Sequence, residues 1–189
     1  ILRENLVRYK DEKNRVILFV DAYNVILSQG PEFVLNKFES FKPARIIFGA
    51  EDVCWPDELL QYEYPLVESN EKRFLNAAGF MGYASDIYEM ISSAETIDND
   101  QIFFSKLFLN EREQRSIVLD KRADIFMNLN NALDEIALPV NGDEVYLHNS
   151  WTDSIPTVIR GNGPSKVFSI FKKKQKITRA FSIRNISVI

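Results

Sequence analysis

Asp21 and Asn24 are the first residues in this sequence whose types and spacing could do chemistry. They follow an apolar run of strand length, Val16–Val20, and Tyr23 lies between them. In α/β sheets, ligands lie at the carboxyl ends of the strands, where an acid is well placed to hold a divalent cation against a phosphate. On its own, the segment is equally consistent with an aspartate that only caps a turn.

Two further segments could converge on the first. Residues 97–101 place acids at the start of a predicted helix, and a glycine-containing loop that ends in Lys166 follows a predicted strand. Glycines let backbone N–H groups approach a phosphate, and a lysine adds a point charge. Helix capping is a simpler role for Asp98 and Asp100, and turns that contain glycine are common. Neither segment is therefore specific by itself.

Trp55 lies in the sequence Cys54-Trp55-Pro56-Asp57, and two interpretations of it stay open. An exposed indole could cover a base or the face of a sugar, whereas a buried indole would belong to the core. The sequence alone does not separate them.

Length and composition predict a single domain with a sizeable core. The chain has 189 residues, of which 46% are hydrophobic and 26% are charged, and its net charge is −4. No broad basic field suggests a nucleic-acid surface, and no apolar run reaches the roughly 18 residues that span a bilayer. Cys54 is the only cysteine, so the redox compartment is undetermined. His148 is the only histidine, which excludes a site that needs two histidines from this chain.

The two ends of the sequence carry separate expectations. Residues 172–189 hold six basic residues and no acids, with no clean period of 2 or 3.6. An edge strand or a basic contact arm would fit this composition, but we expect residues 1–171 to form the domain and 172–189 a poorly ordered basic tail. No signal peptide is visible, and because the chain begins at Ile1 we expect it to belong to a longer protein.

Alternating strands and helices predict an α/β sandwich rather than a helical bundle. Strands are expected at residues 16–20, 45–50, 74–83, 124–127, 144–148 and 156–159. Helices are expected at 31–41, at 86–94 and from 98 through 107, with a further charged turn at 110–115. Asp98 and Gln101 resemble a capping-box pair at the start of the third helix. Residues 51–72 contain Trp55-Pro56 and Tyr64-Pro65 and predict an ordered excursion from the sheet.

Taken in order, these segments resemble the glycosyltransferase domain of the procollagen lysyl hydroxylases. The matching motifs run collinearly from about residue 5 to about residue 168 and are Asp21–Pro31, Ala50-Glu51, Cys54–Pro56, Lys72–Tyr83, Asp98–Phe104, Ile125–Glu135 and Gly161–Lys166. So many ordered matches make the resemblance specific, and it stops at the basic tail.

The resemblance implies a GT-A-like, Rossmann-type α/β sandwich that is incomplete at its N-terminus, where the family has further strands that hold the uridine. Members of this family are multidomain enzymes of the endoplasmic reticulum lumen. They use a UDP-sugar and Mn²⁺ to glycosylate hydroxylysine in collagen. The expected partners are therefore a UDP-sugar, a collagen or collagen-like hydroxylysine acceptor and, through the parent protein, a second copy in a homodimer. No nucleic acid and no membrane span are expected.

By position in the family's motifs, the resemblance assigns a role to each candidate residue. The expected metal ligands are Asp21 and Asn24, the donor-binding residues are Tyr23, Trp55, Arg160, Gly161, Gly163 and Lys166, and the catalytic acidic cluster that faces the acceptor comprises Asp98, Asn99 and Asp100. The chemistry would be displacement at an anomeric carbon, with the metal and fixed donors stabilising the departing diphosphate.

Two metal-ligand positions depart from the family's most active pattern, which has Asp in place of Asn24 and His in place of Arg160. An amide oxygen is a neutral, weaker ligand, and a guanidinium cannot bind a cation at all, so one of three protein ligands is intact. The acidic cluster is also thinner, because Thr96, Ile97 and Asn99 occupy positions that are often Asp.

Two functions therefore stay open. In the first, UDP-sugar-dependent transfer to hydroxylysine-linked acceptors, Arg160 could do part of the metal's electrostatic work on the diphosphate. In the second, the domain is a catalytically degenerate module that serves folding, dimerisation or collagen docking. A different sugar-nucleotide enzyme is a third alternative. Lysine hydroxylation cannot come from this chain, because an Fe(II) site of that type needs two histidines and a carboxylate.

Overall fold

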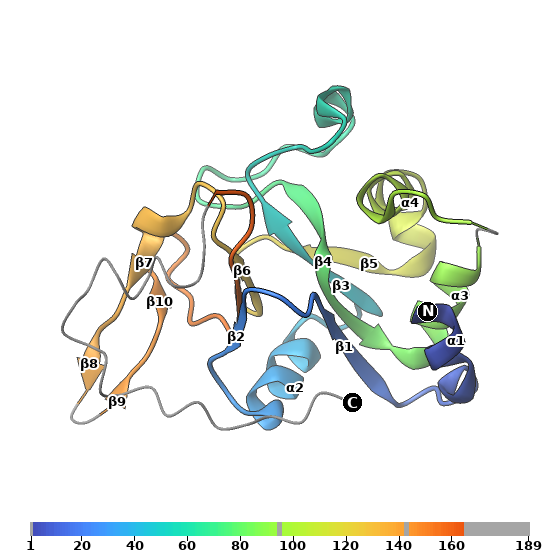
Figure 1. Ribbon diagram of the computed structural model, residues 1–189, viewed down its shortest axis with the longest axis horizontal. Coiled ribbons are helices and arrows are strands. Elements are labelled where there is room, and N and C mark those ends of the chain that lie inside the picture. The colour runs from blue at the N-terminus through green and yellow to red at the C-terminus, as the bar shows by residue number, and fades with distance from the viewer. Residues whose placement is uncertain (1, 94–95, 142–143, 165–189) are drawn as a thin grey trace.

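The computed structural model describes residues 2–93, 96–141 and 144–164, and its centre is a four-stranded sheet (Figure 1). The strands are β1 (Val16–Val20), β3 (Ile46–Glu51), β4 (Phe74–Tyr83) and β5 (Ile117–Asp120), and they lie in the order β1-β4-β3-β5. β4 is antiparallel to β1 and β3, whereas β3 and β5 are parallel. β1, β3 and β5 therefore run in the same direction, and their carboxyl ends meet at one edge of the sheet.

A second, three-stranded sheet meets the first at that edge. It consists of β2 (Val25–Leu27), β11 (Val158–Arg160) and β6 (Phe126–Asn128), with β11 in the middle. β11 is parallel to β6 and antiparallel to β2. The side chain of Asn128, at the carboxyl end of β6, donates a hydrogen bond of 3.1 Å to the carbonyl oxygen of Ala50 in β3. This bond joins the carboxyl ends of the two sheets.

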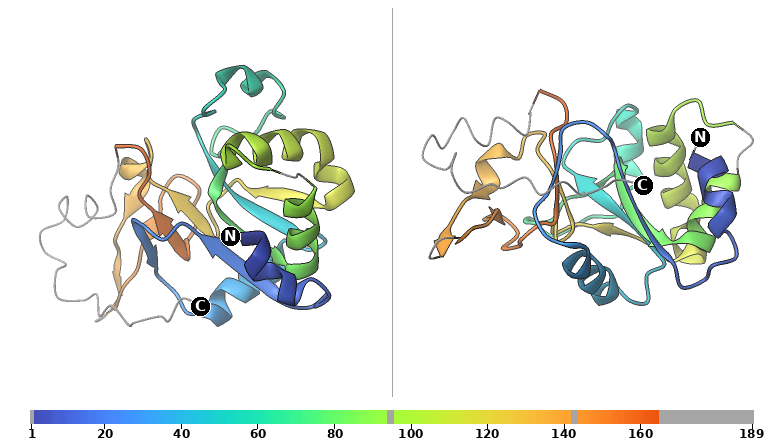
Figure 2. Two further views of the ribbon diagram at one scale, coloured as in Figure 1. Left: turned by 45° about the vertical axis from the view of Figure 1, so that its right-hand side comes forward. Right: turned by 60° about the horizontal axis from the view of Figure 1, so that its bottom comes forward.

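Helices cover both faces of the central sheet (Figure 2). One face carries α1 (Leu2–Leu6), the 3-10 helix η1 (Val7–Tyr9), α3 (Ala84–Ser92) and α4 (Asp100–Arg115), and the other face carries α2 (Pro31–Ser40). Side chains of β3 alternate between these layers, as successive residues of a strand must. Ile46 and Phe48 belong to the core shared with α3 and α4, whereas Ile47 belongs to the core shared with α2. The mixed α/β architecture confirms the predicted fold class.

The remaining strands are short and lie at one end of the molecule, as Figure 1 shows. β7 (Ile136–Ala137) pairs with β10 (His148–Asn149), β8 (Val140–Asn141) pairs with β9 (Glu144–Val145), and the 3-10 helix η3 (Leu133–Glu135) precedes β7. The single strand predicted at 144–148 is therefore wrong, because its two halves pair with different partners.

Most of the longer elements agree with the sequence analysis. The strands predicted at 16–20, 45–50 and 74–83 and the helices predicted at 31–41 and 86–94 are all present, with ends that differ by at most two residues. The strands expected at 124–127 and 156–159 both begin two residues later, as β6 and β11. β2 and β5 were not predicted, because they contain only three and four residues, too few for a hydrophobic alternation to be recognised. Each helix among the described residues is too short or too polar to cross a bilayer.

α4 begins one residue later than a capping pair of Asp98 and Gln101 requires, and that predicted pair is wrong. The N-cap is Asn99, whose side chain accepts a hydrogen bond of 3.0 Å from the backbone N–H of Ile102. Gln101 is buried and bonds β4 instead, accepting 2.8 Å from the N–H of Ala77 and donating 2.7 Å to the carbonyl of Leu75. The register of β4 against β3 shifts between Phe48 and Gly49, which leaves Ala77 without a paired residue in β3, and the amide of Gln101 bonds its N–H instead.

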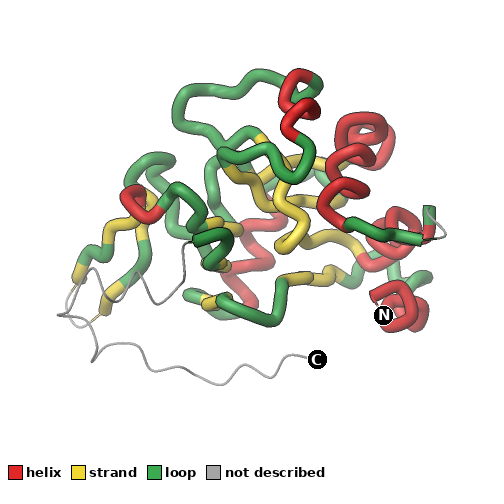
Figure 3. The backbone as a smooth tube through the Cα atoms, turned by 45° about the horizontal axis from the view of Figure 1, so that its top comes forward, coloured by secondary structure: helices red, strands yellow, loops and turns green. Residues whose placement is uncertain are grey.

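The segment between β3 and β4 leaves the sheet and carries the 3-10 helix η2 (Glu58–Tyr62), as Figure 3 shows. The carboxylate of Asp57 caps this helix by accepting a hydrogen bond of 3.1 Å from the N–H of Leu59. The guanidinium of Arg73 donates to three carbonyl oxygens of the segment, at 2.9 Å to Gln61, 2.7 Å to Tyr64 and 3.0 Å to Pro65. These bonds tie the segment to the start of β4, which agrees with the ordered excursion expected there.

Asp120, at the carboxyl end of β5, directs the chain into β6. Its side chain is fully buried and accepts backbone N–H bonds from Asp124 at 2.8 Å and from Ile125 and Phe126 at 2.7 Å. Burial raises the pKa of this carboxyl from 3.8 to about 6, although the three N–H donors oppose the shift. The residue therefore has a structural role, even though it ends a strand next to the polar edge.

We expect Asp120→Asn to lower the free energy of unfolding by about 2 kcal/mol, because an amide offers one acceptor oxygen to three buried donors. The folded pKa lies above the unfolded value, so the native state binds the proton more tightly than the unfolded chain. The stability of the wild-type protein relative to the Asn variant should therefore fall as the pH rises from about 4 to about 6. Urea denaturation of both proteins across this range, with the exposed Asp11→Asn as a control, checks the prediction. Equal stability of the Asp120 and Asp11 variants would contradict it.

Candidate functional site

The carboxyl ends of the two sheets bring a set of polar side chains together from distant parts of the sequence. Asp21 follows β1, Glu51 ends β3 and Arg160 ends β11. Asn76, in the first half of β4, reaches the same edge because β4 runs against its neighbours. Asn162 follows β11 and completes the set, which we call the edge cluster: Asp21, Glu51, Asn76, Arg160 and Asn162.

An ion pair between Asp21 and Arg160 forms one half of the edge cluster. The guanidinium donates from Nη2 to Oδ2 of Asp21 at 2.6 Å. Its Nη1 makes a longer contact of 3.5 Å with Oδ1 of Asn76, and Nε is buried without a hydrogen-bond partner among the described residues. Most of the hydrogen-bonding capacity of Arg160 is therefore not used by strong bonds within the protein.

Glu51 forms the other half. Its side chain is 8% exposed and accepts from Nδ2 of Asn76 at 2.6 Å and from Nδ2 of Asn162 at 3.0 Å. Burial raises the pKa of Glu51, while the hydrogen bond from Asn76 and the charge of Arg160 act against the rise. A carboxylate that takes up a proton more readily than usual, next to a cation, has the properties of a catalytic base.

The glycine loop after β11 is shaped by its contacts with two asparagines. Asn24 has a positive φ of 60°, and its carbonyl oxygen accepts a hydrogen bond of 2.8 Å from the N–H of Gly161. Gly163 also has a positive φ, 56°, and a Cβ there would lie 2.7 Å from Oδ1 of Asn130. Glycine is therefore favoured at position 163, because any side chain there would need the strained left-handed conformation and a shift of the Asn130 side chain. Lys166 and the tail predicted at 172–189 lie outside the described residues.

The other candidates from the sequence lie around the edge cluster rather than in it. Tyr23 and Trp55 are 86% and 61% exposed, so Trp55 is not a core residue. Asp98 and Asp100 are exposed at the start of α4, where Asp100 accepts 2.8 Å from the N–H of Gln101. Asp98, Asn99 and Asp100 make no hydrogen bond or ion pair with Asp21 or Arg160 within the described structure. Gln101 nevertheless ties the start of α4 to the residues of β4 on either side of Asn76.

Sequence reasoning did not single out Glu51, Asn76 or Asn162 as site residues. Glu51 had a usable signal, because it is an acid at the end of a predicted strand, as Asp21 is. Asn76 lies inside an apolar strand, and only the antiparallel direction of β4 brings it to this edge. Asn162 lies between the glycines of the loop, which drew attention to the backbone rather than to its side chain.

The edge cluster does not fit a Mn²⁺ site. Asp21 is paired with Arg160, the guanidinium cannot coordinate a cation, and Asn24 offers only a neutral oxygen. Among the described residues, no group of three or more His, Cys, Asp or Glu side chains is arranged to hold a metal ion. In a metal site, two carboxylates and a divalent cation would have a net charge of zero. The pair of Asp21 and Arg160 also has a net charge of zero, without a metal. Asp21 thus already has a positively charged partner within the protein.

Comparison with known proteins identifies the family. A sequence model described as the PLOD GT domain matches residues 1–174. The chain belongs to this family. It is 43% identical over 171 residues to procollagen-lysine,2-oxoglutarate 5-dioxygenase 1 of Rattus norvegicus and 40% identical over 171 residues to the protein of that name from Homo sapiens. It is 39% identical over 170 residues to the multifunctional procollagen lysine hydroxylase and glycosyltransferase LH3 of Homo sapiens.

These alignments concern one part of much longer proteins. Each covers 88% of this chain but only 23% of the relative. The chain is therefore a glycosyltransferase-like domain of the PLOD GT family, and its mixed α/β sheets agree with the GT-A-like architecture expected of it.

Proposed function

We propose that this domain binds a UDP-sugar and transfers the sugar to a hydroxylysine-linked collagen acceptor, with Arg160 rather than Mn²⁺ supplying the positive charge at the diphosphate. The observation that carries the proposal is the guanidinium of Arg160, held at the carboxyl edge of both sheets by a single strong bond, to Asp21. A planar guanidinium can bind two phosphate oxygens at once. Membership of a family that includes a protein named as a glycosyltransferase supports the reaction class.

The reaction is a displacement at the anomeric carbon of the donor. The acceptor hydroxyl oxygen forms the new bond, and the bond between the anomeric carbon and the diphosphate oxygen breaks with its electron pair passing to the diphosphate. Arg160 stabilises the charge that develops there. The proton of the acceptor hydroxyl passes to a carboxylate, for which Glu51 is suited because burial raises its pKa. Asp100, at the start of α4, binds on the acceptor side.

Titration calorimetry of UDP into the full-length protein, with excess Mn²⁺ or with EDTA, tests the proposal. We expect the dissociation constants in the two conditions to agree within about twofold, which is less than 0.5 kcal/mol. Transfer of sugar from the UDP-sugar to a hydroxylysine peptide should likewise persist in EDTA. Binding or transfer that requires Mn²⁺ would contradict the role given to Arg160.

The catalytically degenerate module is the second candidate, and the Asp21–Arg160 pair itself favours it. An ion pair that neutralises both charges without a ligand is also what remains when a site has lost its metal. Such a domain would serve folding, dimerisation or collagen docking within the longer protein. No binding of UDP in either condition, by protein that unfolds cooperatively, would select this candidate over the transferase.

A further inference from the structure

We propose that Trp151 is a stacking platform for a pyranose ring of the acceptor, on the rim of the candidate site. This inference rests on the proposed function, because it assigns the acceptor side of that reaction. Trp151 lies in the turn between β10 and β11 and is 55% exposed. It is the second of the two tryptophans in the chain, and no motif drew attention to it.

The turn that presents Trp151 is held rigidly by buried polar groups. Oδ1 of Asn149 accepts from the N–H of Trp151 at 2.9 Å and from the N–H of Thr152 at 3.3 Å. The backbones of Asn149 and Ser154 exchange hydrogen bonds of 2.8 and 3.2 Å across the turn. The hydroxyl of Ser154 donates 3.0 Å to the carbonyl of Ala123, beneath the turn. Asn149, Thr152 and Ser154 are buried, yet the largest side chain of the turn is not.

A half-exposed indole on a backbone fixed by buried hydrogen bonds offers a flat apolar surface in a defined position. A tryptophan forgoes much of the favourable free energy of apolar burial when it faces water. In return, a rigid turn has little conformational entropy left to lose when a ligand docks on it. A ligand that docks on this indole therefore gains apolar contact without having to order the turn.

The turn is bonded to Glu135, the last residue of η3. The N–H and hydroxyl of Ser150 both donate to the carbonyl of Glu135, at 2.7 and 2.8 Å, and Nδ2 of Asn149 donates to the Glu135 carboxylate at 3.3 Å. Glu135 is in turn ion-paired with Lys72, which bonds Asp52 at 2.5 Å. Asp52 is the residue next to Glu51 of the edge cluster.

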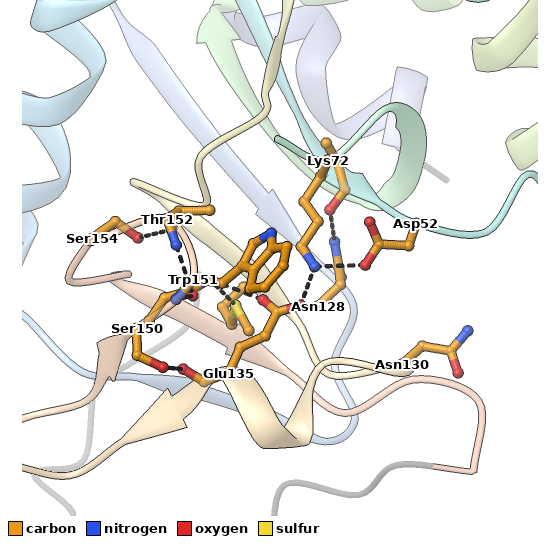
Figure 4. Close-up of polar contacts among 12 residues, drawn as sticks. Asp52, Lys72, Asn128, Asn130, Glu135, Ser150, Trp151, Thr152 and Ser154 are labelled. Carbon is orange, nitrogen blue, oxygen red and sulfur yellow. Dashed lines mark hydrogen bonds and ion pairs between the residues drawn. The ribbon is translucent and has the colours of Figure 1, made fainter. Parts of the chain in front are cut away.

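Figure 4 shows the result of these contacts: the indole of Trp151 projects to the side of its turn on which Glu135, Lys72 and Asn128 lie. Asn128 is the residue that joins β6 to the end of β3. The indole thus lies between its own turn and the carboxyl edge of the two sheets. The proposed transfer takes place at this edge.

The chemistry of this rim fits a saccharide. The indole face is apolar and flat and matches the C–H face of a pyranose, whereas the ring's hydroxyl groups need hydrogen-bond partners at its edge. Asp52 is half exposed, and its carboxylate, already fixed by Lys72, can accept from such hydroxyls. An acceptor that already carries one sugar would therefore bind here better than a bare hydroxylysine side chain.

The test measures binding of methyl β-D-galactopyranoside and methyl β-D-glucopyranoside to the full-length protein by titration calorimetry. We expect at least one glycoside to bind, Trp151→Ala to weaken its binding about tenfold, and Trp151→Phe to retain most of it, because a smaller aromatic face remains. Tyr62→Ala, which removes an exposed aromatic side chain from η2, is the matched control and should bind as the wild type does.

The proposal would be overturned if the wild type bound neither glycoside, or if Trp151→Ala bound the glycoside as well as the wild type does. It would also be overturned if Trp151→Ala lost as much affinity for a sugar-free proline-rich collagen peptide as for the glycoside, because Trp151 would then be a peptide contact. UDP binding is measured on the same variants and should not change. A protein that binds UDP but no glycoside would overturn this inference alone. A protein that binds the glycoside through Trp151 but no UDP would overturn the proposed donor instead.

Discussion

Arg160→Ala should raise the dissociation constant of UDP about 100-fold, equivalent to roughly 3 kcal/mol, because charge-assisted hydrogen bonds to the diphosphate are lost. The carboxylate of Asp21 would then face the diphosphate without its partner and add repulsion. Arg160→Lys should fall between the two proteins, since a lysine keeps the charge but not the planar fork. Titration calorimetry of UDP into the full-length proteins checks the order of the three affinities.

Asp21→Asn gives the sharpest control for that prediction, because the two kinds of site predict opposite signs. Where Arg160 is the cation, removing the carboxylate frees the guanidinium and should tighten UDP binding by about 1 kcal/mol, or roughly fivefold. Where a metal is the cation, the same substitution removes its best ligand and should abolish binding. Weaker binding by Asp21→Asn would therefore contradict the role of Arg160.

The double variant Asn24→Asp with Arg160→His extends the comparison. It adds one carboxylate and one imidazole to the native Asp21, which together make a suitable ligand set for Mn²⁺. UDP binding by this variant should appear only in the presence of Mn²⁺, whereas the wild type should bind equally with EDTA. A variant that still binds UDP in EDTA would show that the charge at position 160 is not what determines the metal requirement.

The sequence predicted the architecture of this domain better than the contacts of its site. The strands at 16–20, 45–50 and 74–83 are long enough for their apolar pattern to decide the element type. They also place Asp21 and Glu51 at strand ends. β2 and β10 contain only two or three residues, and their pairing depends on partners more than 10 residues away, so no local pattern could show them.

The ion pair between Asp21 and Arg160 could not be predicted from the sequence. Resemblance placed both residues near the diphosphate, but they are 139 positions apart and nothing in the sequence says that one neutralises the other. That contact depends on the antiparallel pairing of β2 with β11, which brings Val25 opposite Arg160. The exposure of Trp151 could not be predicted either. Only the fold shows that Asn149, Thr152 and Ser154 of its turn are buried and that the indole is not.

The capping role predicted for Gln101 is wrong for a related reason. Its spacing from Asp98 suits a capping box, and helix capping is a local interaction that a sequence can predict. The register shift of β4 leaves the N–H of Ala77 without a partner in β3, and Gln101 bonds it, together with the carbonyl of Leu75. A buried N–H and carbonyl without partners cost more than an unfilled cap at a solvent-exposed helix end, so the tertiary bonds prevail.

Lys72→Met should lower the free energy of unfolding by about 3 kcal/mol, because it leaves buried carboxylate charge without its partner. The side chain of Lys72 is 4% exposed and bonds both Asp52 and Glu135, and Glu135 is itself largely buried. Methionine fills similar volume, so the loss reports the charge rather than a cavity. Urea denaturation of the two proteins measures the difference.

Lys121→Met is the matched control, because Lys121 is half exposed and pairs with Glu71 at only 3.7 Å, so its loss should cost less than about 1 kcal/mol. The double variant Lys72→Met with Glu135→Gln should recover more than half of the lost stability, since no buried charge is then left unpaired on Glu135. Equal destabilisation by the two lysine variants would place the role of Lys72 in packing alone. Lys72 links Asp52 to Glu135, and Glu135 bonds the turn that carries Trp151. Its loss should therefore also weaken glycoside binding, which ties the stability of this cluster to the acceptor side of the site.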